Sequence, residues 1–419
     1  MPPYGKNEVS PREGCDPTFD ELPWYRAWVL QQVCSQPQRL LLSLPDFNPD
    51  EDPDYGPFFL VWNQIRELAL VPGPKNINTI TDALRSQGVI STEHNYEAAQ
   101  SAKELVFSII GWQTMLYKPD FSPHAVGGYN ILDETPGHRG EARLSLNQFA
   151  PSSSKSLPDF LLGFGLMLPP QNYCTFDDAD DQAVFNQVRV VSVKDINAHV
   201  LTKVCGVAIE WVDSLSCHLE LDKRTGRLFL YRYPSFCVSC LHQHESRKEG
   251  NHSSKSILHR CALEKPGPAP WATEEDVTGL LQEILLSYRL IFGQNKKSRA
   301  VFRRLQPFAR MPTQCHDRFL VQLCGRKRFD SHDVAAVVER DEYDLAADFP
   351  HLRSRLARLH GYASGKKPRS IGQLWRDRRD STAWLAFWSV LIFGSISVVL
   401  AGLQTVFQVL QYLEAKQGS

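Results

Sequence analysis

The chain lacks the features that mark a secreted or disulfide-built protein. Its 419 residues contain ten cysteines, too dilute a number for a scaffold of disulfides. The first residues, Met1–Glu8, contain no apolar run behind a basic start, so we expect no secretory signal peptide. Pro2 stands where N-myristoylation needs a glycine. We therefore expect a cytosolic body with reduced thiols.

An excess of either charge is also missing, because 46 Lys and Arg stand against 47 Asp and Glu. This balance gives no reason to expect nucleic acid as a partner. The chain also lacks the short motifs of P-loop proteins, dinucleotide-binding folds, zinc proteases and serine-hydrolase nucleophile elbows. An enzyme is therefore the less favoured interpretation, although an unfamiliar catalytic site would leave no such motif.

What the chain does have is one long uncharged run near its C-terminal end. No charged residue occurs from Ser381 to Leu413, and the most apolar part, residues 383–403, is 21 residues long. As a helix this part is about 31 Å long, which matches the hydrocarbon core of a bilayer. We therefore predict one transmembrane segment at 381–413. Its expected anchor residues are Trp384, Trp388, Gly394 and Tyr412.

Basic residues in front of this run predict its orientation. Between residues 351 and 380 there are nine bases and two acids, whereas the only base after the run is Lys416. The positive-inside rule then places the body in the cytosol, and the short C-terminal remainder indicates a tail-anchored protein. Because only one base follows, we expect the endoplasmic reticulum or plasma membrane rather than the mitochondrion. The bases nearest the run are Lys366, Lys367, Arg369, Arg376, Arg378 and Arg379.

These bases would attract anionic lipid headgroups, with a merely solvated linker as an equal alternative for each of them. The run itself suggests a further partner. Small residues share one helical face and permit close helix approach, and three glutamines line one face of the distal end. A homodimer through the span therefore stays open. The residues concerned are Gly394, Ser397, Ala401, Gln404, Gln408 and Gln411.

The rest of the chain predicts an α+β body, mainly helical with a small antiparallel sheet in the middle. Apolar residues recur at helical spacing near both ends of this body. In its middle, two alternating runs flank a loop that ends in Gly226, which predicts a β-hairpin over 217–233. The expected regions are helical 1–118, mixed strand and loop 119–265, helical 266–360, a basic linker 361–380 and the transmembrane segment 381–413.

One cysteine and histidine pattern suggests a metal. Cys237 and Cys240 are followed by His259 and Cys261, and zinc prefers thiolate and imidazole ligands at comparable spacings. The alternative is reduced thiols and solvated histidines, because a single residue separates His259 from Cys261. A zinc-stabilised module or a membrane-bound enzyme using Cys237–Cys261 is therefore the alternative function, and we expect no other cofactor.

Two charged clusters complete the candidates. Asp177, Asp178 and Asp181 have the spacing of the Mg²⁺-binding motif of terpene synthases, but a solvated acidic loop is the favoured interpretation. The second cluster could meet membrane phosphates or nucleic acid, with solvated helix faces as the favoured alternative. It consists of Lys296, Lys297, Arg299, Arg303, Arg304, Arg326, Lys327 and Arg328.

Several stretches together carry a resemblance. They are Glu210-Trp-Val-Asp-Ser-Leu215, Leu219-Glu-Leu-Asp222, Tyr233-Pro-Ser-Phe-Cys237, Ser287-Tyr-Arg-Leu-Ile-Phe-Gly293 and Leu374-Trp-Arg-Asp-Arg-Arg-Asp380 with the span that follows. The chain resembles a group of functionally uncharacterised filamentous-fungal proteins. The resemblance implies a fungal source and a cytosolic body on one C-terminal span, but no catalytic residues. We expect a tail-anchored interaction or regulatory protein at the cytosolic face of a membrane.

Overall fold

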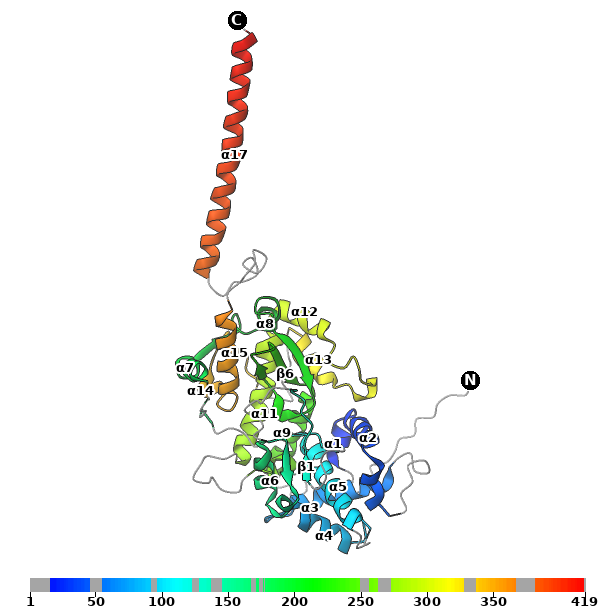
Figure 1. The fold of residues 1–419 in the computed structure, drawn as a ribbon. Coiled ribbons are helices and arrows are strands. Elements are labelled where there is room, and N and C mark those ends of the chain that lie inside the picture. The colour runs from blue at the N-terminus through cyan, green and yellow to red at the C-terminus, as the bar shows by residue number, and fades with distance from the viewer. Residues whose placement is uncertain are drawn as a thin grey trace, which may run out of the picture.

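The computed structural model shows a mainly helical body with small sheets, and one long C-terminal helix that stands away from it (Figure 1). This confirms the predicted fold class. The residues described are 16–45, 55–91, 96–122, 128–136, 145–166, 171–172, 176, 178–248, 256–262, 273–327, 337–366 and 381–417.

The N-terminal part of the body is helical, as its apolar spacing predicts. Helix α4 begins with a capping box, in which the side chains of Asn76 and Thr79 each bond to the other's backbone N–H. Helix α3 has a proline in its first turn, where no intrahelical N–H partner is needed. The elements are α1 Pro17–Glu21, α2 Tyr25–Cys34, the 3-10 helix η1 Gln38–Ser43, α3 Gly56–Leu70, α4 Ile77–Ser86 and α5 Tyr96–Thr114.

The middle of the chain contributes small sheets. Strand β6 pairs antiparallel with β5, which is the hairpin predicted over 217–233, and also pairs parallel with β4, which was not predicted. Strand β1 pairs antiparallel with β2, and β3 pairs antiparallel with the distant β7. The strands are β1 Gly128–Asn130, β2 Asn147–Phe149, β3 Val190–Ser192, β4 Ala208–Val212, β5 Glu220–Asp222, β6 Arg227–Tyr231 and β7 Glu342–Asp344.

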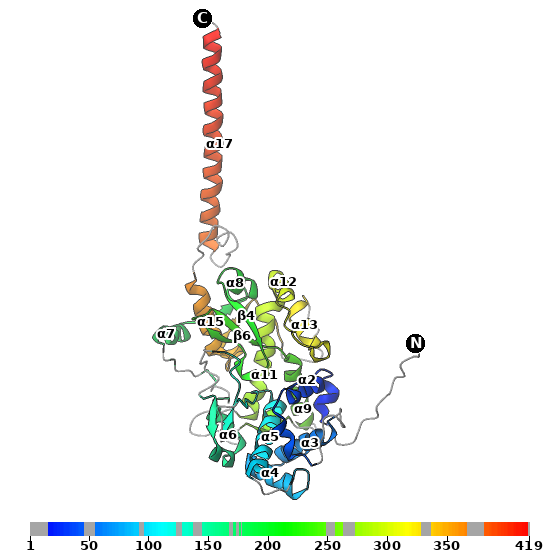
Figure 2. The same cartoon turned by 45° about the vertical axis from the view of Figure 1, so that its right-hand side comes forward.

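Helices surround these strands, and α11 runs through the middle of the body (Figures 1 and 2). Helix α11 follows the N-cap Thr273, which forms a capping box with Asp276, and lies in the region expected to be helical. The helical elements are η2 Ala150–Ser154, α6 Leu157–Phe164, α7 Ala179–Gln187, α8 Ala198–Lys203, η3 Leu215–Cys217, α9 Pro234–Lys248, α10 Ile257–Arg260, α11 Glu274–Tyr288, the π-helix η4 Arg289–Gly293, α12 Lys296–Leu305, η5 Thr313–Cys315, α13 Arg318–Gly325, α14 Leu345–Asp348 and α15 Arg353–Gly365.

One continuous hydrophobic cluster holds the body together. It runs from Phe19 in α1 to Ala363 in α15 and draws on all three regions expected in the body. Helix α15 continues to Gly365, five residues into the segment expected as a linker, because Ala363 on its inner face is buried. The regional boundaries at 118 and 265 stay predictions.

Candidate functional site

The long C-terminal helix α17, Ser381–Gln417, is the first candidate site. Its stretch Leu385–Leu413 is 29 residues long, and the most apolar 18-residue window in it has a mean hydropathy of 2.1 and no buried residue. Val390 and Val398 are 74% and 73% exposed. Contiguous apolar surface of this size marks contact with lipid or with another protein. At about 1.5 Å per residue the stretch exceeds the roughly 30 Å hydrocarbon core of a bilayer.

The hydroxyl groups of this stretch are satisfied inside the helix. The hydroxyls of Ser389, Ser395, Ser397 and Thr405 each donate to the carbonyl oxygen four residues earlier, at 2.7–2.9 Å. Lipid offers no hydrogen bonds, so a polar side chain there needs such a partner. The serine and threonine hydroxyls of the stretch are therefore compatible with a bilayer.

The predicted anchor residues all lie on α17. Tyr412 is 67% exposed, and a Cβ atom added at Gly394 would meet nothing within 4 Å. Trp388 is described, whereas the side chain of Trp384 is not. Of the predicted basic lead-in, Lys366 ends the body with its ammonium 4.8 Å from the Tyr362 ring centroid. The other lead-in bases lie outside the described residues: Lys367, Arg369, Arg376, Arg378 and Arg379.

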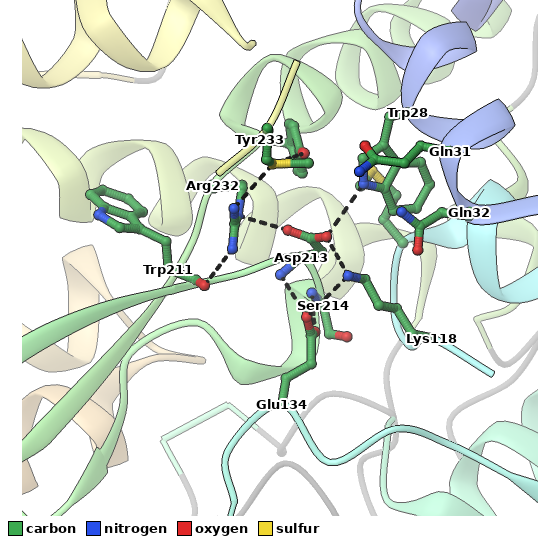
Figure 3. A network of polar contacts seen from close by, with 12 residues as sticks. Trp28, Gln31, Gln32, Lys118, Glu134, Trp211, Asp213, Ser214, Arg232 and Tyr233 are labelled. Carbon is green, nitrogen blue, oxygen red and sulfur yellow. Dashed lines mark hydrogen bonds and ion pairs between the residues drawn. The ribbon is translucent and has the colours of Figure 1, made fainter. Parts of the chain in front are cut away.

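A buried charge network is the second candidate site, and Figure 3 shows it converging on Asp213 at the end of β4. The Asp213 carboxylate pairs with the ammonium of Lys118 and, at 2.7 Å, with Nε of Arg232. It also accepts a hydrogen bond from the indole N–H of Trp28 at 3.3 Å. Glu134 accepts the backbone N–H of Asp213 at 3.1 Å. The network thus ties α2 to the loops after α5 and β1 and to the central sheet.

The electrostatics of this network favour a structural role. Burial raises the pKa of the Asp213 carboxyl, but Lys118 and Arg232 outweigh burial and hold that pKa below its ordinary value. Burial acts to lower the pKa of Lys118, but the nearby carboxylates of Glu134 and Asp213 have a larger effect. The net result is a pKa above the ordinary value for lysine. Lys118 is therefore a protonated ammonium at neutral pH and cannot act as a nucleophilic amine. The two acids, Asp213 and Glu134, balance the two bases, Lys118 and Arg232. Their pairing joins separate segments of the chain.

The predicted zinc ligands are placed by α9 and α10, but no metal site is formed by them in the structure. Among the described residues, no group of three or more His, Cys, Asp and Glu side chains gathers as a metal site. Burial raises the pKa of the Cys240 and Cys261 thiols to about 12, and zinc binds the thiolate. The His259 ring stacks on His244 at 4.2 Å, and its Nε2 lies 3.1 Å from the Thr278 hydroxyl. The zinc set stays a prediction.

The described aspartates of the acidic motif, Asp178 and Asp181, form ion pairs with basic residues of the body. Asp178 caps α7 by accepting the N–H of Asp180 at 2.9 Å. Asp181 is buried and pairs with Lys223 and, at 3.1 Å, with Arg358. Asp177 lies outside the described residues. The two described carboxylates thus hold α7 against α15 and the hairpin turn.

Sequence reasoning missed a buried histidine clamp. His351 Nδ1 lies 2.7 Å from Glu283 and Nε2 lies 3.3 Å from Asp276, both on α11. Burial lowers the pKa of His351, but the two carboxylates outweigh it and the pKa is raised. The clamp borders a polar cavity of about 240 Å³ that is also lined by the ion pair of Arg340 and Asp348. His351 lies 68 positions after Glu283 and 75 positions after Asp276, so no local sequence pattern could reveal their contact.

Comparison with known proteins gives no relative: no protein-family model, no curated protein and no solved structure matches this chain. The chain has, among its described residues, one helix that is long and apolar enough to cross a membrane, and this is compatible with a single-pass membrane protein.

Proposed function

We propose that the chain is a single-pass, tail-anchored membrane protein whose body faces the cytosol. The observation that carries this proposal is α17, whose 29-residue apolar stretch is not buried by the rest of the chain and contains an 18-residue window with a mean hydropathy of 2.1. A core helix of a water-soluble protein would have its apolar side chains covered by neighbouring elements. We propose that a bilayer covers the apolar side chains of α17 instead, and that this bilayer belongs to the endoplasmic reticulum or the plasma membrane.

The orientation rests on the charges that flank α17. Nine bases against two acids precede it between residues 351 and 380, and a single base follows it. The positive-inside rule keeps the more basic side in the cytosol. With so few residues after the span, membrane insertion follows the end of synthesis. A fungal origin is part of the same proposal, because it is what the resemblance implies.

For the body we propose an interaction or regulatory role at the membrane surface. Exposed apolar side chains support it: Phe149 on β2 is 83% exposed, with Leu132 and Leu146 exposed at 43% and 39% beside the same pair of strands. The backbone N–H of Ile131 bonds to the carbonyl of Leu146, so these segments are neighbours. Exposed apolar side chains of this kind are available for contact with a partner protein.

A second copy of the chain is the other partner that we propose. Gly394, Ser397 and Ala401 follow one another at intervals of three and four residues, so they share a face of α17. Residues this small let two spans approach closely, and interhelical hydrogen bonds from glutamines such as Gln404 would add to that contact.

Alkaline-carbonate extraction of cells tests the anchor. The full chain, tagged at its N-terminus, should stay in the membrane pellet, and a chain truncated after Gly372 should be soluble. Val398→Arg should weaken insertion by about 2.5–3.5 kcal/mol, whereas the matched control Val398→Leu should not. A full chain extracted as completely as the truncation would contradict the proposal.

Glycosylation then tests the orientation. The sequon Asn251-His252-Ser253 lies in the body, outside the described residues. In a cytosolic body it stays unmodified, and a second sequon appended after Ser419 should be glycosylated. Modification of Asn251 without modification of the appended sequon would show the opposite orientation.

A further inference from the structure

The body carries one strongly basic surface, formed by α12, α13 and the loop between them. From residue 294 to 327 there are nine bases and a single acid, Asp317, which is 1% exposed. Eight of the nine bases are exposed. The exposed carboxylate nearby, Glu339, pairs with the buried Arg289, whose guanidinium also bonds the carbonyl oxygens of Arg326 and Lys327. We call the eight exposed bases the basic surface: Lys296, Lys297, Arg303, Arg304, Arg310, Arg318, Arg326 and Lys327.

The geometry of α12 explains how its bases share one face. Val301 and Phe302 are buried, and they anchor the opposite side of the helix. Lys296 and Arg303 are seven residues apart, as are Lys297 and Arg304, so each pair lies two turns apart on the same side. The exposed half of α12 is therefore lined by like charges.

These charges are not neutralised within the described part of the chain. Elsewhere on the body, arginines meet carboxylates: Arg340 pairs with Asp348 at 2.6 Å and Arg358 with Asp181 at 3.1 Å. No carboxylate among the described residues lies within 4 Å of a charged nitrogen of the basic surface. Like charges held together in this way repel one another unless an anionic partner binds.

Short helix α8 connects this surface to the point where the chain leaves the body. Near the start of α8, the backbone N–H of His199 donates to the hydroxyl of Ser298 in α12 at 3.1 Å. After its end, the thiol of Cys205 lies 3.8 Å from the carbonyl oxygen of Ala363, near the end of α15. Figures 1 and 2 both place α8, α12 and the end of α15 at the end of the body nearest α17.

We propose that the basic surface binds anionic lipid headgroups of the same membrane that α17 crosses. The inference rests on the proposed anchoring, because α17 brings the membrane within reach of this end of the body. A cytosolic leaflet is negatively charged, and its potential falls off within about 8 Å at physiological salt, so only a surface held this close can use it. The body then lies against the bilayer through α12 as well as through its basic lead-in.

The test uses the full chain in nanodiscs and the reactivity of individual lysines. Discs contain phosphatidylcholine alone, or phosphatidylcholine with about 30% phosphatidylinositol, an anionic lipid of the cytosolic leaflet whose headgroup has no amine to consume the reagent. An amine-reactive reagent modifies lysines, and mass spectrometry gives the rate at each one. We expect Lys296 and Lys297 to react at least about threefold more slowly in the anionic discs, with the difference lost at about 0.5 M salt.

Lys155 serves as the reference within the same sample. Lys155 is exposed and lies two residues before α6, and both views place α6 at the end of the body away from α17 (Figures 1 and 2). Its rate should therefore be the same in both discs. The double variant Lys297→Gln, Arg304→Gln should abolish the slowing at Lys296. The matched double variant Lys75→Gln, Arg85→Gln, which keeps Lys155 as the reference, should retain it.

Any outcome other than selective slowing of Lys296 and Lys297 in the anionic discs overturns the proposal. Equal rates for Lys296 in the two discs, or an equal slowing of Lys155, would show that the basic surface has no special contact with lipid. Slowing of Lys296 by a 20-base-pair DNA duplex added to phosphatidylcholine discs, without slowing in anionic discs, would make it a nucleic-acid site. A chain that enters neither disc contradicts the anchoring as well, whereas a chain that enters both with unchanged rates contradicts this inference alone.

Discussion

The body and α17 contain the same kinds of apolar residue but place them in opposite surroundings. In the body, Trp28, Trp62 and Trp112 are at most 1% exposed. In α17, Phe393 and Val398 are 69% and 73% exposed. Burying such side chains contributes about 25 cal/mol for each Å² removed from water. The body obtains this stabilisation from its own fold, and α17 obtains it only from lipid or a partner.

The two regions also differ in how they satisfy polar groups. The body buries whole charges and pairs them across distant segments, as Asp213 does with Lys118 and Arg232. Helix α17 has no charge between residues 385 and 413, and its hydroxyls bond to carbonyls one turn earlier. A buried charge depends on the rest of the fold to supply its partner, whereas a hydroxyl on α17 finds its hydrogen-bond partner in its own helix. The two regions should therefore respond to different substitutions.

The largest effect on the body should come from Asp213→Ala. It leaves the mostly buried Lys118 and Arg232 without their central acid, which should lower the free energy of unfolding by about 3 kcal/mol. Denaturant unfolding of the full chain in detergent micelles, followed by tryptophan fluorescence, measures this change. The exposed acid Asp180 in Asp180→Asn is the control and should change stability by less than about 0.5 kcal/mol. Equal effects of the two variants would show that the network does not stabilise the body.

The matching change in α17 is Val398→Arg. An arginine at the centre of a span opposes insertion by about 2.5–3.5 kcal/mol and should leave the unfolding of the body unchanged. A glycosylation-based insertion assay measures the first quantity, and the fluorescence transition measures the second. If Val398→Arg lowers the stability of the body, then α17 packs on the body, and the contrast drawn above is wrong.

A smaller effect should follow Thr273→Ala, which removes the N-cap of α11. Thr273 accepts the backbone N–H of Asp276, and loss of such a cap costs about 1 kcal/mol. The exposed Thr313 is the comparison, since Thr313→Ala removes a hydroxyl from a surface 3-10 helix. Stability equal to that of the unchanged chain would show that α11 is held by packing alone.

Two buried histidines should give pH dependences of opposite sign. The pKa of His351 is raised, so its stabilisation is complete below the ordinary value of 6.5 and is lost as pH rises through the folded-state pKa. Burial, and then the nearby Arg355, lower the pKa of His218 well below 6.5, so its stabilisation is present above 6.5 and is lost as pH falls.

Replacing each histidine with glutamine separates these contributions. His351→Gln should destabilise the body more at about pH 5.5 than at about pH 8, and His218→Gln should do the reverse. Unfolding free energies at the two pH values measure both. The same sign of pH dependence for the two variants would contradict the pairing of His351 with Glu283 and Asp276.

Local patterns in the sequence predict local structure in this chain, but not its distant pairings. Helix α11, within the helical region expected at 266–360, and the hairpin of β5 and β6 both depend on neighbouring residues, and local patterns predict both. The parallel pairing of β4 with β6 and the antiparallel pairing of β3 with β7 join separate parts of the chain. No periodicity encodes which strand lies beside which, so these pairings were missed.

The same distinction applies to the candidate sites. The apolar stretch of α17 and the bases of α12 are contiguous in sequence, and both were identified from it. Asp213 and Lys118 are 95 positions apart, so their pairing needed the fold. Cys237 and Cys240 have a spacing that suits zinc and lie buried on α9, where burial raises the pKa of each thiol, and the zinc set stays a prediction.

The most direct test of the account is alkaline-carbonate extraction of the full chain beside the chain truncated after Gly372. Both should show the same unfolding transition, because α17 contributes nothing to the core of the body. We predict that the full chain stays in the membrane pellet and that the truncated chain is released. Release of both chains would contradict the account and would mean that the apolar surface of α17 is covered by a protein instead of a bilayer.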